Sequence, residues 1–72
     1  MTEAIELLDV VALAQDMPER GLARGQVGTV VELLAPGVFE VEFSDDRGKT
    51  YAMLPVASSQ LLLLRTAPVR SA

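Results

Sequence analysis

Apolar and polar residues alternate most regularly in the middle of the chain, where Phe39, Val41 and Phe43 are separated by Glu40 and Glu42. Alternation with a period of two predicts a β-strand that buries one face. A slip of one residue would turn the glutamates inward, so the pattern indicates which face of this strand is inside. The strand is the clearest element that the sequence predicts.

Four further apolar runs, each bounded by turn residues, predict an all-β domain. Residues 55–60, PVASSQ, are too broken for a strand and predict a single turn of 3₁₀ helix before the last strand. The loop between the first two strands contains Asp16, Pro18 and Gly21. The long loop covers residues 15–24. The expected strands are residues 7–14, residues 27–34, the alternating strand that contains Phe39 to Phe43, a fourth strand that begins near residue 49, and residues 61–65.

Two turn signals join the middle strands into hairpins. Pro36 and Gly37 suit a tight turn, because proline presets φ and glycine accepts a positive φ. Asp45 and Asp46, followed by Gly48, predict the second turn, since aspartate bonds its own backbone. Together these signals predict a meander of three strands.

The second hairpin has an expected register, which places two apolar pairs inside. The same register leaves Val38 and Leu54 facing outward together near one end of the hairpin. The expected pairs are Phe43 with Lys49, Val41 with Tyr51, Phe39 with Met53 and, on the outer face, Glu42 with Thr50.

A helix is the alternative for residues 3–17, where apolar residues also recur at helical spacing, and for the run Leu61 to Leu64. We favour strands because Val10 and Val11 are β-branched and because the later strands need a partner to close the sheet. Five short strands, a long first loop and a 3₁₀ turn before the last strand together predict a five-stranded SH3-like barrel.

Residues 6–64 resemble a family of short bacterial SH3-like proteins of unknown function. The resemblance lies in LLDVVAL, GTVVE and FEVEF followed by D..G.TYA, and it implies the fold but no established activity. Association of such proteins with small toxin-like or nuclease-like neighbours would imply an antitoxin or immunity role. More distantly, Gly25-x-x-Gly28-x-Val30 resembles the KOW element, and the layout is similar to the SH3-like domain of the nitrile hydratase β subunit and its activators.

Seventy-two residues predict one domain, residues 1–72, with an ordered core over about 6–65 and a loose tail at 66–72. The chain contains no cysteine and no histidine, so neither disulfides nor the usual zinc, copper and haem ligands are available. Only three residues are aromatic, which leaves a core of mainly Leu, Val, Ala and Met. Such a core stabilises a small domain by roughly 3–5 kcal/mol.

The formal net charge of −4 argues against binding to polyanions and to membrane surfaces. Acidic residues at the amino terminus do not match a secretory signal, and no apolar run approaches the ~20 residues that span a bilayer. We therefore expect a cytoplasmic protein.

The residue types also disfavour enzymatic chemistry. Without histidine and cysteine, neither a Ser-His-Asp nor a Cys-His arrangement can form, so we expect no catalytic residues and no enzyme. Gly21, Gly25 and Gly28 lack the spacing and the Lys-Ser or Lys-Thr of a phosphate loop, and we expect no cofactor. Glu40 and Glu42 point the same way and could hold a cation, but a wet outer face favours a solvated surface, and no metal is expected.

Binding to another protein is the function that remains, with a basic partner for the acidic side chains. Arg20 and Arg24 could instead contact phosphate in a KOW-like manner, and an accessory subunit or chaperone of a larger enzyme is a third alternative. Leucines on both faces of the strand from Leu61 to Leu64 would also suit a homodimer, unless Ile5, Leu7, Leu8 or Leu22 covers them. The candidate contact residues are Glu32, Glu40, Glu42, Asp45, Asp46, Arg20, Arg24, Val38 and Leu54.

Overall fold

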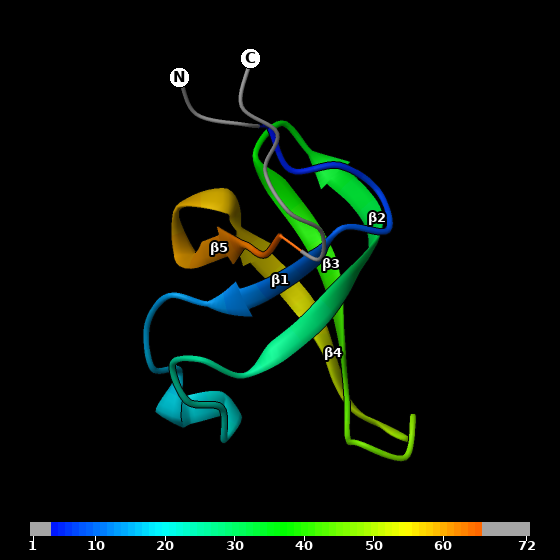
Figure 1. Cartoon of the computed structure of the whole chain (residues 1–72). Helices are drawn as coiled ribbons and strands as arrows, with labels where there is room; N and C mark the ends of the chain where they lie inside the picture. The colour runs from blue at the N-terminus through cyan, green and yellow to red at the C-terminus, as the bar shows by residue number, and fades with distance from the viewer. Residues whose placement is uncertain (1–3, 66–72) are drawn as a thin grey trace.

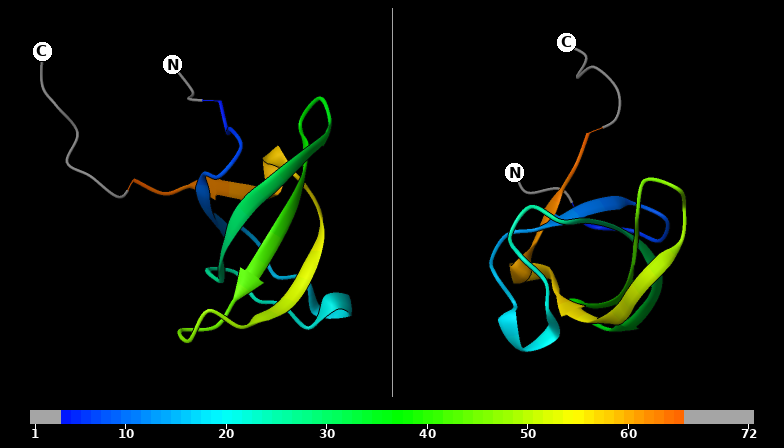
Figure 2. Two further views of the ribbon diagram at one scale, coloured as in Figure 1. Left: turned by 90° about the vertical axis from the view of Figure 1, so that its right-hand side faces the viewer. Right: turned by 90° about the horizontal axis from the view of Figure 1, so that it is seen from below.

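Five antiparallel strands form one sheet over residues 4–65, the part of the chain that the computed structural model describes (Figure 1). The strand order is β4-β3-β2-β1-β5, and the strongly bent sheet curls round on itself (Figure 2). No α-helix occurs within these residues. The elements are β1 (Val10–Leu13), the 3₁₀ turn η1 (Pro18–Arg20), β2 (Val27–Ala35), β3 (Val38–Ser44), β4 (Thr50–Ala57), the 3₁₀ turn η2 (Ser58–Gln60) and β5 (Leu61–Leu63).

This architecture confirms the predicted fold: an all-β, five-stranded SH3-like barrel with a short 3₁₀ turn directly before the last strand. Helix is absent from both segments where it was the alternative, since β1 and β5 are strands. Residues 66–72, the predicted loose tail, lie outside the described residues. Within residues 4–65, no helix is long and apolar enough to cross a membrane.

The inner face of β3 is buried as its alternation predicts. Phe39, Val41 and Phe43 are buried, and Glu40 and Glu42 are half-buried on the opposite face. The three apolar side chains belong to one core cluster with Val11 and Leu13 of β1, the neighbouring strands and the long loop. A single core therefore fills the concave side of the sheet.

The β2–β3 hairpin turns at Pro36 and Gly37, as predicted, and Gly37 adopts a φ of +76°. Gly28, at the end of the same hairpin far from its turn, is required for a different reason. A Cβ there would lie 2.7 Å from Cγ1 of Val41 and 2.9 Å from the carbonyl oxygen of Glu42, so β2 and β3 pass too close for any larger residue. The glycine is thus a packing requirement of the barrel.

The expected register of the β3–β4 hairpin is wrong by three residues. The true partners are Phe43 with Ala52, Val41 with Leu54 and Phe39 with Val56. The pair Ser44–Thr50 beside the turn is already shifted by two residues, and the irregularity between Phe43 and Ser44, which inserts Tyr51, adds the third. An odd shift exchanges the two faces of β4. Leu54 therefore faces the core, and β4 continues through Pro55 to Ala57, residues that the sequence predicted as part of the 3₁₀ turn.

Strand β1 is shorter than the predicted run of residues 7–14 because a turn precedes it. The N–H of Asp9 bonds to the carbonyl of Glu6 at 3.1 Å, and Oδ2 of Asp9 accepts the N–H of Glu6 at 2.7 Å. Leu8 within this turn has a φ of +71°, the only non-glycine residue of the described part with a positive φ. The chain is thus turned rather than extended until Val10.

The long loop over residues 15–24 is partly core. Met17 and Leu22 form an isolated β-bridge around η1, and both side chains are buried in the core cluster. Ile5 also packs against this cluster, whereas Leu7 and Leu8 are 60% and 71% exposed. Four residues were candidates to cover exposed apolar side chains. Leu22 and Ile5 pack in or against the core cluster, whereas Leu7 and Leu8 remain in solvent.

Candidate functional site

Three carboxylates share the outer face of β2 and β3, and we name Glu32, Glu40 and Glu42 the acidic face. Glu32 lies directly opposite Glu40 in the β2–β3 ladder, and Glu42 follows two residues further along the same side of β3. Thr50 Oγ1 donates a hydrogen bond of 2.7 Å to Oε2 of Glu42. The predicted meeting of Glu42 and Thr50 therefore occurs between side chains, although Met53 is the ladder partner of Glu42.

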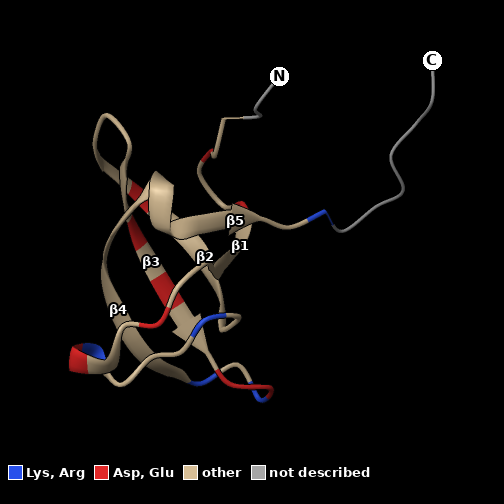
Figure 3. Ribbon diagram, turned by 90° about the vertical axis from the view of Figure 1, so that its left-hand side faces the viewer, with Lys and Arg blue, Asp and Glu red and all other residues tan. Residues whose placement is uncertain are grey.

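The basic side chains lie elsewhere in the described part of the chain. None of its lysines and arginines belongs to a strand: they occupy η1, the loops and the segment after β5 (Figure 3). Among residues 4–65, no lysine or arginine forms an ion pair with the acidic face. Its negative potential is therefore reduced by solvent and salt rather than by ion pairs with the cations of residues 4–65.

Asp45 and Asp46 lie in the turn between β3 and β4, separate from the acidic face (Figure 3). Oδ1 of Asp45 accepts the N–H groups of Arg47 and Lys49, each at 2.9 Å. This aspartate therefore stabilises the turn, as its position in the sequence predicts. Within the described residues, no group of three Asp and Glu side chains could hold a metal ion.

Arg20 and Arg24 remain exposed in the long loop, Arg20 within η1 and Arg24 after it. The backbone N–H of Arg24 bonds to Oδ1 of Asp16 at 2.8 Å, which holds the loop rather than the guanidinium. Both residues belong to the segment between β1 and β2, whereas the acidic face lies on β2 and β3. The structure therefore does not combine them with the acidic face into one site.

Val38 and Leu54 do not form the outward pair that the sequence predicted. Leu54 is 2% exposed and belongs to the core, whereas Val38 is half-buried at the start of β3. The reason is the register of the hairpin, in which Leu54 pairs with Val41 and Val38 pairs with Ala57. The predicted apolar patch at this position is thus absent.

A different apolar surface lies on the outer side of β1. Ala12 is flanked there by Val27 of β2 and by Leu62 of β5, and Leu62 is 58% exposed. Val10 continues the same side of β1, two residues before Ala12, and Leu64 continues the same side of the chain after β5. We name Val10, Ala12, Val27, Leu62 and Leu64 the apolar face; the four consecutive leucines indicated its β5 part, but no periodicity indicated Val27 or Ala12.

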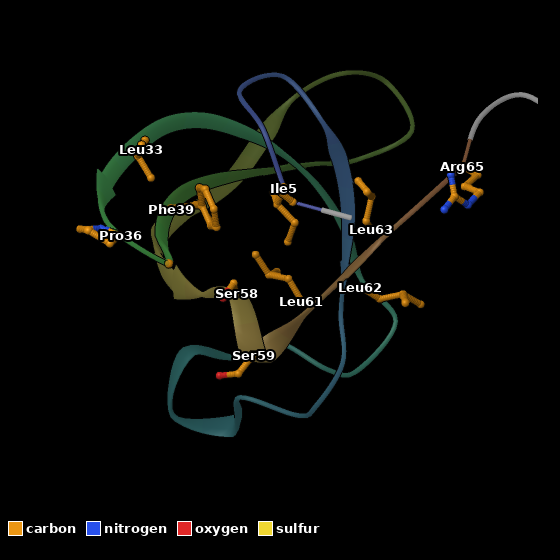
Figure 4. Close-up of a pocket in the computed structure, with 12 residues that line it drawn as sticks. Ile5, Leu33, Pro36, Phe39, Ser58, Ser59, Leu61, Leu62, Leu63 and Arg65 are labelled. Carbon is orange, nitrogen blue, oxygen red and sulfur yellow. The ribbon is translucent and has the colours of Figure 1, made fainter. Parts of the chain in front are cut away.

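A cleft of about 790 Å³ opens at the end of the barrel between the β2–β3 turn and β5 (Figure 4). Leu61 points into it beside Ile5 and Phe39, and Leu62 points away. Polar side chains at the cleft are those of Ser58, Ser59 and Arg65, so its lining contains no carboxylate. The cleft is an apolar surface, and neither serine has a histidine or cysteine to activate it, because the chain has none.

The comparison with known proteins follows the same boundaries as the sheet. A family model described as a domain of unknown function (DUF4926) matches residues 7–63, which include all five strands. No curated protein and no solved structure matches the chain. The family match covers both the acidic face and most of the apolar face.

Proposed function

We propose that this chain, which belongs to the DUF4926 family of domains of unknown function, is a non-enzymatic module that binds a basic partner protein through its acidic face. The observation that carries the proposal is the direct cross-strand pairing of Glu32 with Glu40. Like charges in this position destabilise a sheet, by roughly 0.2–1 kcal/mol. A partner that supplies positive charge offsets this repulsion. Binding of such a partner therefore stabilises the folded sheet.

The distribution of charge supports the same proposal. The acidic face is uninterrupted by lysine or arginine, and the described cations lie in η1, in loops or after β5. Complementary charge accelerates the encounter of two proteins and sets which partners are rejected, more than it sets affinity. A partner with a concentrated basic surface is therefore the one that this face selects.

A small nuclease-like toxin encoded beside the chain is the specific partner that we propose. The nucleic-acid surface of such a protein is basic, because it must neutralise phosphate charges. An acidic sheet face that occupies that surface would block nucleic acid, which is how an antitoxin or immunity protein can act. The localisation that we propose with this function is cytoplasmic.

Reversal of charge on the acidic face tests the proposal. The probes are the purified products of the genes adjacent to the chain's own, and binding is measured by titration calorimetry. We expect the variant with Glu40→Lys and Glu42→Lys to lose at least ten-fold in affinity, because two attractions become repulsions. We expect the variant to remain folded, since a lysine at 40 faces Glu32 as an opposite charge and the hydrogen bond lost between Thr50 and Glu42 is exposed.

The matched control changes net charge equally at two exposed acids outside the face, Glu6→Lys and Glu19→Lys. Its affinity should fall less than three-fold. Equal losses in both variants would show that only net charge matters, and unchanged binding after reversal of the face would exclude it as the contact. If the chain instead binds RNA or DNA, and Arg20→Ala with Arg24→Ala abolishes that binding, a KOW-like nucleic-acid function replaces this proposal.

A further inference from the structure

Strand β5 leaves one side of its backbone unpaired. It pairs only with β1 among the described residues, where the N–H of Leu64 bonds to the carbonyl of Val10 at 3.0 Å and the carbonyl of Gln60 accepts the N–H of Ala14 at 2.8 Å. Residues at alternate positions of a strand present their N–H and C=O groups to opposite sides. Leu61 and Leu63 therefore turn their backbone groups away from β1.

These outward groups form a small edge. The N–H of Leu61 already bonds to the carbonyl of Ser58, so the edge offers the carbonyl of Leu61 and both polar groups of Leu63. Leu63 is thus the outward residue of β5 that can both donate and accept. Unpaired edges of this kind readily accept another strand.

The other edge strand of the sheet, β4, is protected by its own residues at the end next to η2. Pro55 has no N–H to offer, and the N–H of Ala57 bonds to Oε1 of Gln60 at 3.0 Å. Proline and local capping are devices by which proteins keep edge strands from pairing. The end of β4 next to η2 is therefore blocked, Met53 is the outward residue of β4 whose backbone groups stay open, and Leu63 is its counterpart on β5.

We infer that β5 pairs with β5 of a second copy of this chain, antiparallel, with Leu63 of each copy at the two-fold axis. Each Leu63 then donates its N–H to, and accepts from, the Leu63 of the other copy, as an antiparallel hydrogen-bonded pair requires. Leu62 of each copy lies beside Leu64 of the other on the outer side. Leu61 and Leu63 remain on the inner side, next to the cleft.

A second copy is the occupant that the charges favour. Each chain has a net charge of −4, so contact between two copies is least opposed by repulsion where carboxylates are absent. The apolar face and the cleft on the two sides of β5 contain no Asp or Glu, whereas β2 and β3 present the acidic face. The arrangement also explains why leucine occupies four consecutive positions, since both sides of the strand meet leucines of the partner.

The first test is the mass of the protein in solution, measured by light scattering over about 5–500 μM. We expect twice the chain mass of 7.7 kDa at the upper concentrations. The substitution Leu62→Glu, at an exposed position, should yield the monomer mass because it places a carboxylate beside Leu64 of the other copy. Met53→Glu, at an exposed residue of β4, should leave the dimer intact.

The second test is amide hydrogen exchange, which does not depend on any variant folding. In the dimer the N–H of Leu63 should exchange at least ten-fold more slowly than at a dilution that gives monomer, while the N–H of Leu64, bonded within the chain, changes little. A monomer at all concentrations, a dimer that Leu62→Glu leaves unchanged, or a Leu63 amide whose exchange ignores concentration would each overturn the inference. Binding of an unrelated protein strand at β5 without self-association would do so as well.

Discussion

Leu8 is the residue whose backbone is least suited to its side chain. Its φ of +71° lies in the left-handed region, which residues other than glycine, asparagine and aspartate seldom adopt, and its side chain is 71% exposed. The turn that holds it is closed by Asp9 through two hydrogen bonds to Glu6. The exposed leucine gains little from burial there, so its conformation is a net cost to the folded chain.

Replacement of Leu8 by asparagine should therefore stabilise the protein by about 1 kcal/mol, since left-handed strain costs roughly 1–2 kcal/mol and asparagine tolerates it better. The free energy of unfolding is measured by urea titration. Leu7→Asn is the matched control, because Leu7 is 60% exposed in the same turn and has no positive φ. Equal effects of the two substitutions would show that the backbone of Leu8 is not strained.

Among the elements, β3 and β4 show what the sequence could and could not predict. From Phe39 to Phe43 of β3 the apolar residues fall on one parity and the glutamates on the other, so the inner face follows from the pattern alone. In β4 apolar residues occur on both parities: Tyr51 and Met53 on one, Leu54 and Val56 on the other. The register then depends on the irregularity beside Ser44, which no periodicity encodes.

The same difference between a regular and an irregular strand decides which candidate site residues the sequence could place correctly. The outward side of Glu40 and Glu42 was predictable because they belong to the regular strand, whereas Glu32 joins them only through the register shift between Val30 and Glu32, which no periodicity encodes. Leu54 was misplaced because it belongs to the strand whose parity was ambiguous. The burial of Met17 was not foreseen and that of Leu22 was only an alternative, since an isolated bridge across η1 depends on a tertiary contact rather than on local spacing.

The register of β4 can be tested by two truncations of adjacent residues. Leu54→Ala should destabilise the protein by about 2–5 kcal/mol, because it opens a cavity beside Val41 in the core. Met53→Ala should change stability by less than about 1 kcal/mol, because Met53 is 48% exposed. Urea titration measures both, and a larger loss at Met53 would support the register that the sequence predicted.

On the scale of the whole molecule, the outer surface of the barrel divides into two chemically different halves. The outer side of β1, β5 and the start of β2 is apolar, whereas the later part of β2 and β3 carry three carboxylates. With ten acids and six bases, the chain could have paired most of its charges, yet its described cations avoid the strands. This division separates the surface proposed for a basic partner from the one proposed for a second copy.

The same charge distribution predicts how stability responds to salt. The Debye length falls from about 30 Å at 0.01 M salt to about 3 Å at 1 M, so repulsion within the acidic face is screened. In urea titrations, which add no ions, we expect the free energy of unfolding to rise by roughly 0.2–1 kcal/mol over this range. Glu32→Gln should raise stability at low salt and reduce the salt response, because it removes the partner of Glu40.

Glu19→Gln gives the matched control for this response, since it removes one charge from exposed η1, where Arg20 is the next residue. Its salt dependence should stay close to that of the unaltered chain. If Glu32→Gln and Glu19→Gln behave alike, the response comes from net charge rather than from the Glu32–Glu40 pair. If added salt lowers the free energy of unfolding, repulsion within the acidic face does not destabilise the chain. The physical basis for a basic partner at this face is then lost.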